Sequence, residues 1–182
     1  MTVTIYIDHN VWDYLFEKDV DLLSELPATK YVLAITREAE FEIPPTPDAK
    51  RQYITKALEA CSVEARPYFG FFEDDHPANE QRVAGLDEGY FASAREVEFI
   101  ESQRSRLSSE KKSKTRLFKN EADISLAARS FDSIVLTFDK KAGPLKDAFD
   151  LGGNVIYLES AQVTGLSIGT VVELHVKAHG LA

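Results

Sequence analysis

The sequence predicts an α/β protein of three layers, in which helices cover both faces of a central parallel sheet of about four or five strands. Two observations carry this prediction. Short apolar runs rich in β-branched residues recur along the chain, as expected of strands buried on both faces. Helical patterns stand between these runs, and strand–helix–strand units place their strands parallel in one sheet.

Four strands are expected, at residues 3–7, 31–35, 133–137 and 154–158. Each is a short apolar run bounded by polar or turn-forming residues, which is the pattern of a buried strand. The alternation of strand and helix stops after the second strand and resumes near residue 120.

The helices are predicted from apolar residues at helical spacing and from residues that start or stop helices. The first carries Val11, Trp12, Leu15 and Phe16 on one side. Later helices are expected at 37–43, from Thr46-Pro47, from about Asp87 with Tyr90, Ala94, Val97 and Ile100 on one stripe, at 120–131, and at 167–179 before Gly180.

The length of 182 residues predicts a single domain. Residues 62–119 break the α/β pattern and are interpreted as a helical and basic insertion within that domain. One cysteine excludes an internal disulfide and fits a reducing compartment. With neither a signal peptide nor an apolar run long enough to span a membrane, the chain is expected to be cytoplasmic, without a membrane partner.

The formal net charge is −9, from 30 acidic and 21 basic residues. This balance argues against non-specific wrapping of nucleic acid, which usually needs a basic surface. It is compatible with a nuclease whose acids gather in the site and whose bases form a local patch.

Four acidic residues stand at the ends of predicted strands or near the starts of predicted helices: Asp8, Glu42, Asp123 and Asp139. Ligands bind at the carboxyl edge of parallel sheets, so these side chains are expected to meet there. Several carboxylates in one place need a counter-charge, and a hard divalent cation is the usual one. The sequence therefore predicts a metal site suited to a phosphate ester.

Each of these acids also has a structural interpretation. Asp8 could cap the helix that follows it, and Asp123 stands three residues after Asn120, as in a capping box. Asp139 could be a turn residue. Glu42 shares a helix face with Glu38, so either of the two could be the ligand.

The motifs around these acids resemble those of PIN-domain proteins. Ile7-Asp8-His9-Asn10-Val11 resembles the first PIN motif, and Thr36 followed six residues later by Glu42 resembles the second. An Asp that opens an alanine-rich helix at 121–128 resembles the third motif. The strand end Thr137-Phe138-Asp139 resembles the fourth. The four motifs occur in the order of the family, at residues 3–43 and 120–158.

The resemblance implies a PIN-like fold and a metal-dependent ribonuclease, the toxin of a toxin–antitoxin pair. It implies that Asp8, Glu42, Asp123 and Asp139 hold Mg²⁺ or Mn²⁺, and that Asn10 and Thr137 orient ligands or a metal-bound water. RNA as the substrate, an antitoxin protein and a second copy of the chain as partners follow from the same resemblance.

A basic run in the insertion is the candidate nucleic-acid contact, since clustered cations bind phosphates. A solvated, non-functional face is the alternative. The run contains Arg104, Arg106, Lys111, Lys112, Lys114, Arg116 and Lys119.

Two other functions stay open at this point. Phosphohydrolases of the haloacid dehalogenase kind also use an Asp after the first strand, but they normally need Asp-x-Asp, whereas this chain has Asp8-His9-Asn10. A PIN-like scaffold that binds RNA or protein without cutting is the second alternative.

Overall fold

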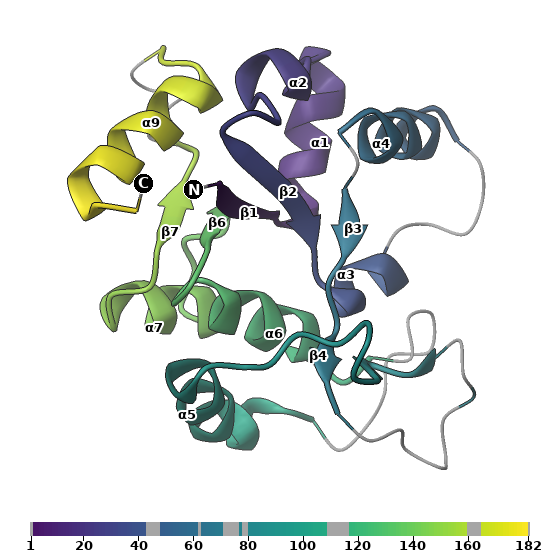
Figure 1. Ribbon diagram of the computed structural model, residues 1–182, viewed down its shortest axis with the longest axis vertical. Coiled ribbons are helices and arrows are strands. Elements are labelled where there is room, and N and C mark those ends of the chain that lie inside the picture. The colour runs from purple at the N-terminus through teal and green to yellow at the C-terminus, as the bar shows by residue number, and fades with distance from the viewer. Residues whose placement is uncertain are drawn as a thin grey trace.

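The computed structural model describes residues 2–42, 48–61, 63–70, 77, 80–108, 117–159 and 165–181. It is a mixed α/β structure in which helices flank a five-stranded parallel sheet, so the predicted three-layer fold is confirmed (Figure 1). The elements up to the start of the insertion are β1 (Val3–Ile7), α1 (His9–Lys18), α2 (Leu22–Glu25), β2 (Tyr31–Ile35), α3 (Arg37–Glu42) and α4 (Ala49–Ala60). The later elements are β3 (Glu64–Ala65), β4 (Tyr68–Phe69), β5 (Val83–Ala84), α5 (Ala94–Gln103), the 3₁₀ helix η2 (Arg104–Arg106), α6 (Glu121–Arg129), β6 (Ile134–Thr137), α7 (Pro144–Asp150), β7 (Val155–Tyr157) and α9 (Ile168–His179).

The main sheet has the strand order β3-β2-β1-β6-β7, and every pairing in it is parallel. The central strand β1 pairs with β2 on one side and with β6 on the other, with Ile7 opposite Leu136. The carboxyl ends of β1 and β6 therefore meet at one edge of the sheet. Short strands β4 and β5 form a separate two-stranded sheet.

Each face of the sheet carries its own hydrophobic cluster. On one face α1, α2, α4 and α9 pack through buried residues that include Trp12, Ile54 and Val172. On the other, α5, α6 and α7 pack through residues that include Phe99 and Ala148. Figure 1 shows the two helical layers above and below the sheet.

Two predicted helix starts are wrong. The helix expected from about Asp87 begins at Ala94, because Ser93 and Glu96 form a capping box. Its buried residues are Glu96, Phe99 and Gln103, not the expected stripe, and Val97 is 47% exposed.

The helix expected to open at Thr46-Pro47 begins instead at Ala49. The carboxylate of Asp48 caps it by accepting a hydrogen bond from the backbone N–H of Arg51 at 2.7 Å. Thr46 and Pro47 themselves lie outside the described residues.

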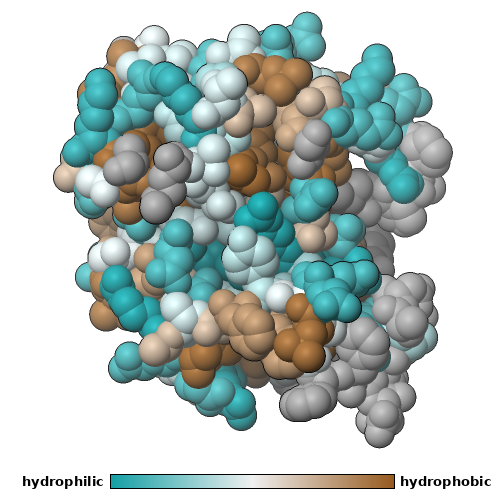
Figure 2. All heavy atoms as spheres, viewed as in Figure 1, coloured by the Kyte–Doolittle hydropathy of each residue, from teal (hydrophilic) through white to brown (hydrophobic). Residues whose placement is uncertain are grey.

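The surface mixes polar and apolar side chains, as Figure 2 shows for one face. Leu86 and Phe91, in the segment between β5 and α5, are the most exposed of the large hydrophobic residues described, at 73% and 67%. In the described part of the chain, no helix has the length and apolar character needed to cross a membrane.

Candidate functional site

The candidate site lies at the carboxyl edge of the sheet, where β1 and β6 end side by side. Asp8 follows the last residue of β1, and its backbone N–H donates to the carbonyl of Leu136 at 3.0 Å. This bond extends the parallel ladder by one residue, so the side chains that follow the two strands face a common region.

A hydrogen-bond network connects the acids of β1 and β6. The Oδ2 atom of Asp8 accepts from the Thr137 hydroxyl at 2.5 Å and from the Asn10 side-chain amide at 2.6 Å. Asn10 Oδ1 in turn accepts from the backbone N–H of Phe138 at 2.9 Å. The Thr137 oxygen accepts from the backbone N–H of Asp139 at 2.9 Å. Asn10 and Thr137 thus fix the orientation of Asp8 and the start of the Asp139 loop.

The Asp8 side chain is buried, and its surroundings disfavour the ionised carboxylate. Its side chain makes no cap hydrogen bond typical of an N-cap residue, although it occupies the N-cap position of α1. Burial, chiefly, and the nearby negative charge of Asp123 raise the pKa of Asp8 from its ordinary value of 3.8 to about 6, against the lowering effect of the Thr137 hydrogen bond. A carboxylate that is costly to ionise, placed beside a second carboxylate, is typical of functional sites.

The four predicted acids line two small pockets at this edge. Asp8, Glu42 and Asp123 line a narrow cleft between β1, α3 and α6. Asp123 and Asp139 line a pocket of about 210 Å³ next to it. Asp123 lines both pockets, so the two pockets adjoin at this residue.

The acids do not converge on a single point. Among the residues that the structure describes, no three His, Cys, Asp or Glu side chains are grouped so that they could hold one metal ion. The edge offers carboxylate oxygens, which are the ligand type of magnesium and manganese sites. To coordinate one ion, the side chains would have to turn toward a common centre.

The structure separates the two candidate glutamates of α3. Glu42 lines the cleft with Asp8, whereas Glu38 is buried one turn earlier and accepts a hydrogen bond from the Ser125 hydroxyl of α6 at 2.7 Å. Burial raises the pKa of Glu38, against the lowering effect of the Ser125 hydrogen bond. Glu38 thus contacts α6 rather than the cleft.

The structural alternatives for the other two acids have different outcomes. Asn120 precedes α6 without a side-chain cap hydrogen bond, and its amide donates to the carbonyl of Arg106 at 3.0 Å instead. The capping-box interpretation of Asp123 is therefore wrong. Asp139 does act as a turn residue, because its Oδ1 accepts from the backbone N–H of Lys141 at 2.9 Å.

Only part of the predicted basic run is described. Arg104 and Arg106 form η2 and pair with Glu101 and Asp147. Lys119 is exposed, close to the start of α6. The remaining members lie outside the described residues: Lys111, Lys112, Lys114 and Arg116.

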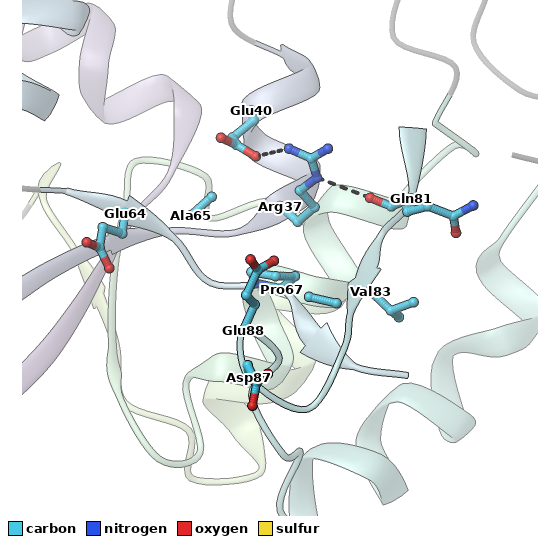
Figure 3. Close-up of a pocket in the computed structure, with 10 residues that line it drawn as sticks. Arg37, Glu40, Glu64, Ala65, Pro67, Gln81, Val83, Asp87 and Glu88 are labelled. Carbon is cyan, nitrogen blue, oxygen red and sulfur yellow. Dashed lines mark hydrogen bonds and ion pairs between the residues drawn. The ribbon is translucent and has the colours of Figure 1, made fainter. Parts of the chain in front are cut away.

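A larger pocket lies elsewhere, between α3, β3 and the segment around β5, and has a volume of about 690 Å³. Figure 3 shows Arg37 at its wall, engaged by Glu40 and by the backbone carbonyl of Gln81. Its other acids, which include Glu64 and Asp87, are exposed to water. Exposed acids are ordinary, so the buried Asp8 edge is the stronger candidate.

Sequence reasoning did not identify Lys141, which lines the pocket beside Asp123 and Asp139. The available signal was its place two residues after Asp139, in the loop that leaves the sheet edge.

No protein-family model matches this chain, and neither a curated protein nor a solved structure does. The resemblance to PIN domains therefore stays a prediction that rests on the four motifs.

Proposed function

We propose that this chain is a metal-dependent endonuclease that hydrolyses phosphodiester bonds in RNA, with its site at the Asp8 edge of the sheet. The observation that carries the proposal is the buried Asp8 carboxylate, whose pKa of about 6 reflects burial and the neighbouring Asp123. Glu42 lines the cleft with Asp8, and Asp139 lines the adjacent pocket, which shares Asp123 with the cleft. The preference for RNA rests on the PIN-domain resemblance.

The donor set fits a hard divalent cation. Asp8, Glu42, Asp123 and Asp139 offer only carboxylate oxygens, which are the ligands of Mg²⁺ and Mn²⁺. A cation would offset both effects that raise the pKa of Asp8, which are chiefly burial and, to a smaller extent, the negative charge of Asp123. When bound, the ion would supply a more acidic water and would offset negative charge on the phosphate.

The chain's own residues contribute orientation. The Thr137 hydroxyl and the Asn10 amide both donate to one oxygen of Asp8, so the carboxylate is held in one rotamer before any ligand arrives. Asn10 also binds the backbone of Phe138 and thereby anchors the loop that carries Asp139. Such preorganisation lowers the cost of assembling the site.

The experiment that tests the proposal is cleavage of a panel of labelled single-stranded RNA, structured RNA and DNA with Mg²⁺ or Mn²⁺. We expect the wild type to cut RNA and to stop when a chelator is added. Asp8→Asn combined with Asp123→Asn should abolish cutting, because two of the four proposed ligands lose their charge.

The matched control is Asp87→Asn combined with Asp132→Asn, which removes the same charge from exposed positions and should cut like the wild type. Cutting that survives in chelator, or no cutting by well-folded wild type on any substrate, would contradict the proposal. Hydrolysis of a phosphomonoester through an aspartyl-phosphate would favour the phosphohydrolase alternative.

A second prediction distinguishes the two glutamates of α3. Glu42→Gln should lower kcat/KM by about ten- to a hundredfold, because Glu42 lines the cleft with Asp8. Glu38→Gln should leave cleavage near the wild-type level, because the Gln oxygen can still accept the Ser125 hydroxyl. The opposite ranking in the same cleavage assay would make Glu38 the ligand.

A further inference from the structure

The pocket of about 210 Å³ beside the acids is lined by residues of both charges. Asp123 and Asp139 are its acids, and Arg106 and Lys141 are its cations. The volume lies below the range of about 300–1,000 Å³ that is typical of sites for drug-sized ligands. The pocket therefore suits a small anionic group rather than a whole cofactor.

Arg106 is held at the pocket by contacts with Asn120 and Asp147. The Asn120 amide donates to the backbone carbonyl of Arg106 at 3.0 Å and thereby joins η2 to the start of α6. Asn120 itself adopts the left-handed conformation, with φ of 66°. The guanidinium donates to Asp147 at 2.6 Å through one amino group. Since a guanidinium has five N–H donors, others remain for a ligand.

Lys141 is placed by the loop that follows Asp139. Its backbone N–H donates to Asp139 Oδ1, which turns the chain at the pocket rim. Within the described ranges, its ammonium group makes no ion pair, although two carboxylates line the same pocket. The preceding residue differs, because Lys140 pairs with Glu159 at 2.8 Å.

We propose that Arg106 and Lys141 form a subsite for a backbone phosphate of single-stranded nucleic acid, next to the phosphate that is cleaved. This inference rests on the proposed function. A planar guanidinium binds two phosphate oxygens at once, and an ammonium adds a mobile point charge. Asp123 and Asp139 line the same pocket and would hold the cleavage chemistry, so a strand bound there would place one phosphate at the acids and a neighbouring phosphate at Arg106 and Lys141.

The test is equilibrium binding of a labelled single-stranded RNA oligonucleotide by fluorescence anisotropy, in chelator so that no cleavage occurs. Lys141→Gln and Arg106→Gln should each raise Kd by about three- to tenfold. Each should also lower the magnitude of the slope of log K against log salt by about 0.7. Lys141→Arg should bind like the wild type, because it keeps the charge.

Lys140→Gln is the matched control for Lys141→Gln, because it removes an equal charge one residue earlier, from a side chain already paired with Glu159. It should bind nearly as the wild type does. Equal effects of Lys140→Gln and Lys141→Gln would overturn the subsite, since they would show that only net charge matters. Lys141 is exposed, so its substitution tests binding without disturbing the fold.

Failure of the subsite is distinguishable from failure of the proposed nuclease. A wild type that cuts RNA with metal but whose Lys141→Gln variant binds normally would overturn the subsite and leave the nuclease. Weaker binding by Lys141→Gln but not Lys140→Gln, without any cleavage, would support the subsite in a protein that only binds nucleic acid. A wild type that binds no oligonucleotide at low salt would overturn the subsite.

Discussion

Asp8→Asn is expected to make the metal-free protein more stable at pH 8, by up to about 3 kcal/mol. The folded chain holds the pKa of Asp8 at about 6, whereas its ordinary value is 3.8. That difference is the cost of ionising the carboxylate in the folded state, and asparagine does not ionise. The Asn oxygen can still accept from the Thr137 hydroxyl and the Asn10 amide, so these two hydrogen bonds persist.

The raised pKa of Asp8 determines how the stability difference between the two proteins depends on pH. Between about pH 4 and pH 6 the folded wild type binds more protons than the unfolded chain, so the free energy of unfolding falls as pH rises. Asp8→Asn lacks this contribution. The two proteins should therefore match near pH 4 and diverge up to about pH 6, above which the gap stays constant.

Urea unfolding in chelator at several pH values measures this gap. Asp132→Asn, which removes an exposed carboxylate, should change stability by no more than about 0.5 kcal/mol at any of them. Added Mn²⁺ should stabilise the wild type and not Asp8→Asn, because ligand binding to the folded state adds to its stability. A variant that is less stable than the wild type at pH 8 would show that the ionised carboxylate is favourable where it lies.

Arg129→Ala is expected to be strongly destabilising, at about 3–5 kcal/mol. Arg129 ends α6 and is 3% exposed. Its guanidinium carbon lies 3.4 Å from the centre of the Tyr68 ring and 5.5 Å from that of Tyr6, and Nη2 donates to the carbonyl of Arg66 at 2.5 Å. Truncation removes these contacts and leaves a cavity between α6 and the insertion.

The positive charge of Arg129 also stabilises the negative charge of a buried neighbour. Its charge lowers the pKa of the buried Glu38, in opposition to the larger effect of burial. Arg129→Met, which keeps much of the volume, should cost less than Arg129→Ala. The difference in unfolding free energy between Arg129→Met and Arg129→Ala measures the packing contribution, and the cost that remains in Arg129→Met measures the contribution of the charge.

The matched control is Arg95→Met. Arg95 also stacks on an aromatic ring, with its guanidinium carbon 4.6 Å from the centre of the Phe131 ring, but it is exposed. Its loss should cost no more than about 1 kcal/mol. Equal midpoints for Arg95→Met and Arg129→Met in denaturant unfolding would contradict the role given to Arg129.

Local sequence was sufficient where one pattern dominated. The strands at 3–7 and 31–35 have the predicted bounds, because an uninterrupted apolar, β-branched run favours a buried strand whatever surrounds it. Ser93-x-x-Glu96 was an equally local signal for the start of α5. The expected apolar stripe from Tyr90 onward pointed to the wrong start, because spacing alone does not tell which face of a segment will be buried.

Other features depended on contacts between distant residues. Strand β3 has only two residues and exists because β2 offers an edge to pair with, so no run in the sequence predicts it. The placement of Arg106 at the pocket likewise depends on Asn120, which follows it by 14 residues.

The sequence by itself determined the three-layer fold and the order of acids at the strand ends, because both follow from the apolar pattern and from the residues next in line. Only the tertiary structure decided which acids face each other. Glu38 and Glu42 share a helix face, yet packing against α6 buried Glu38 against Ser125 and left Glu42 at the cleft. The raised pKa of Asp8 has the same origin, since it comes from burial and from Asp123, which is distant in the chain. Burial and charge proximity belong to the packed chain, so local sequence cannot encode them.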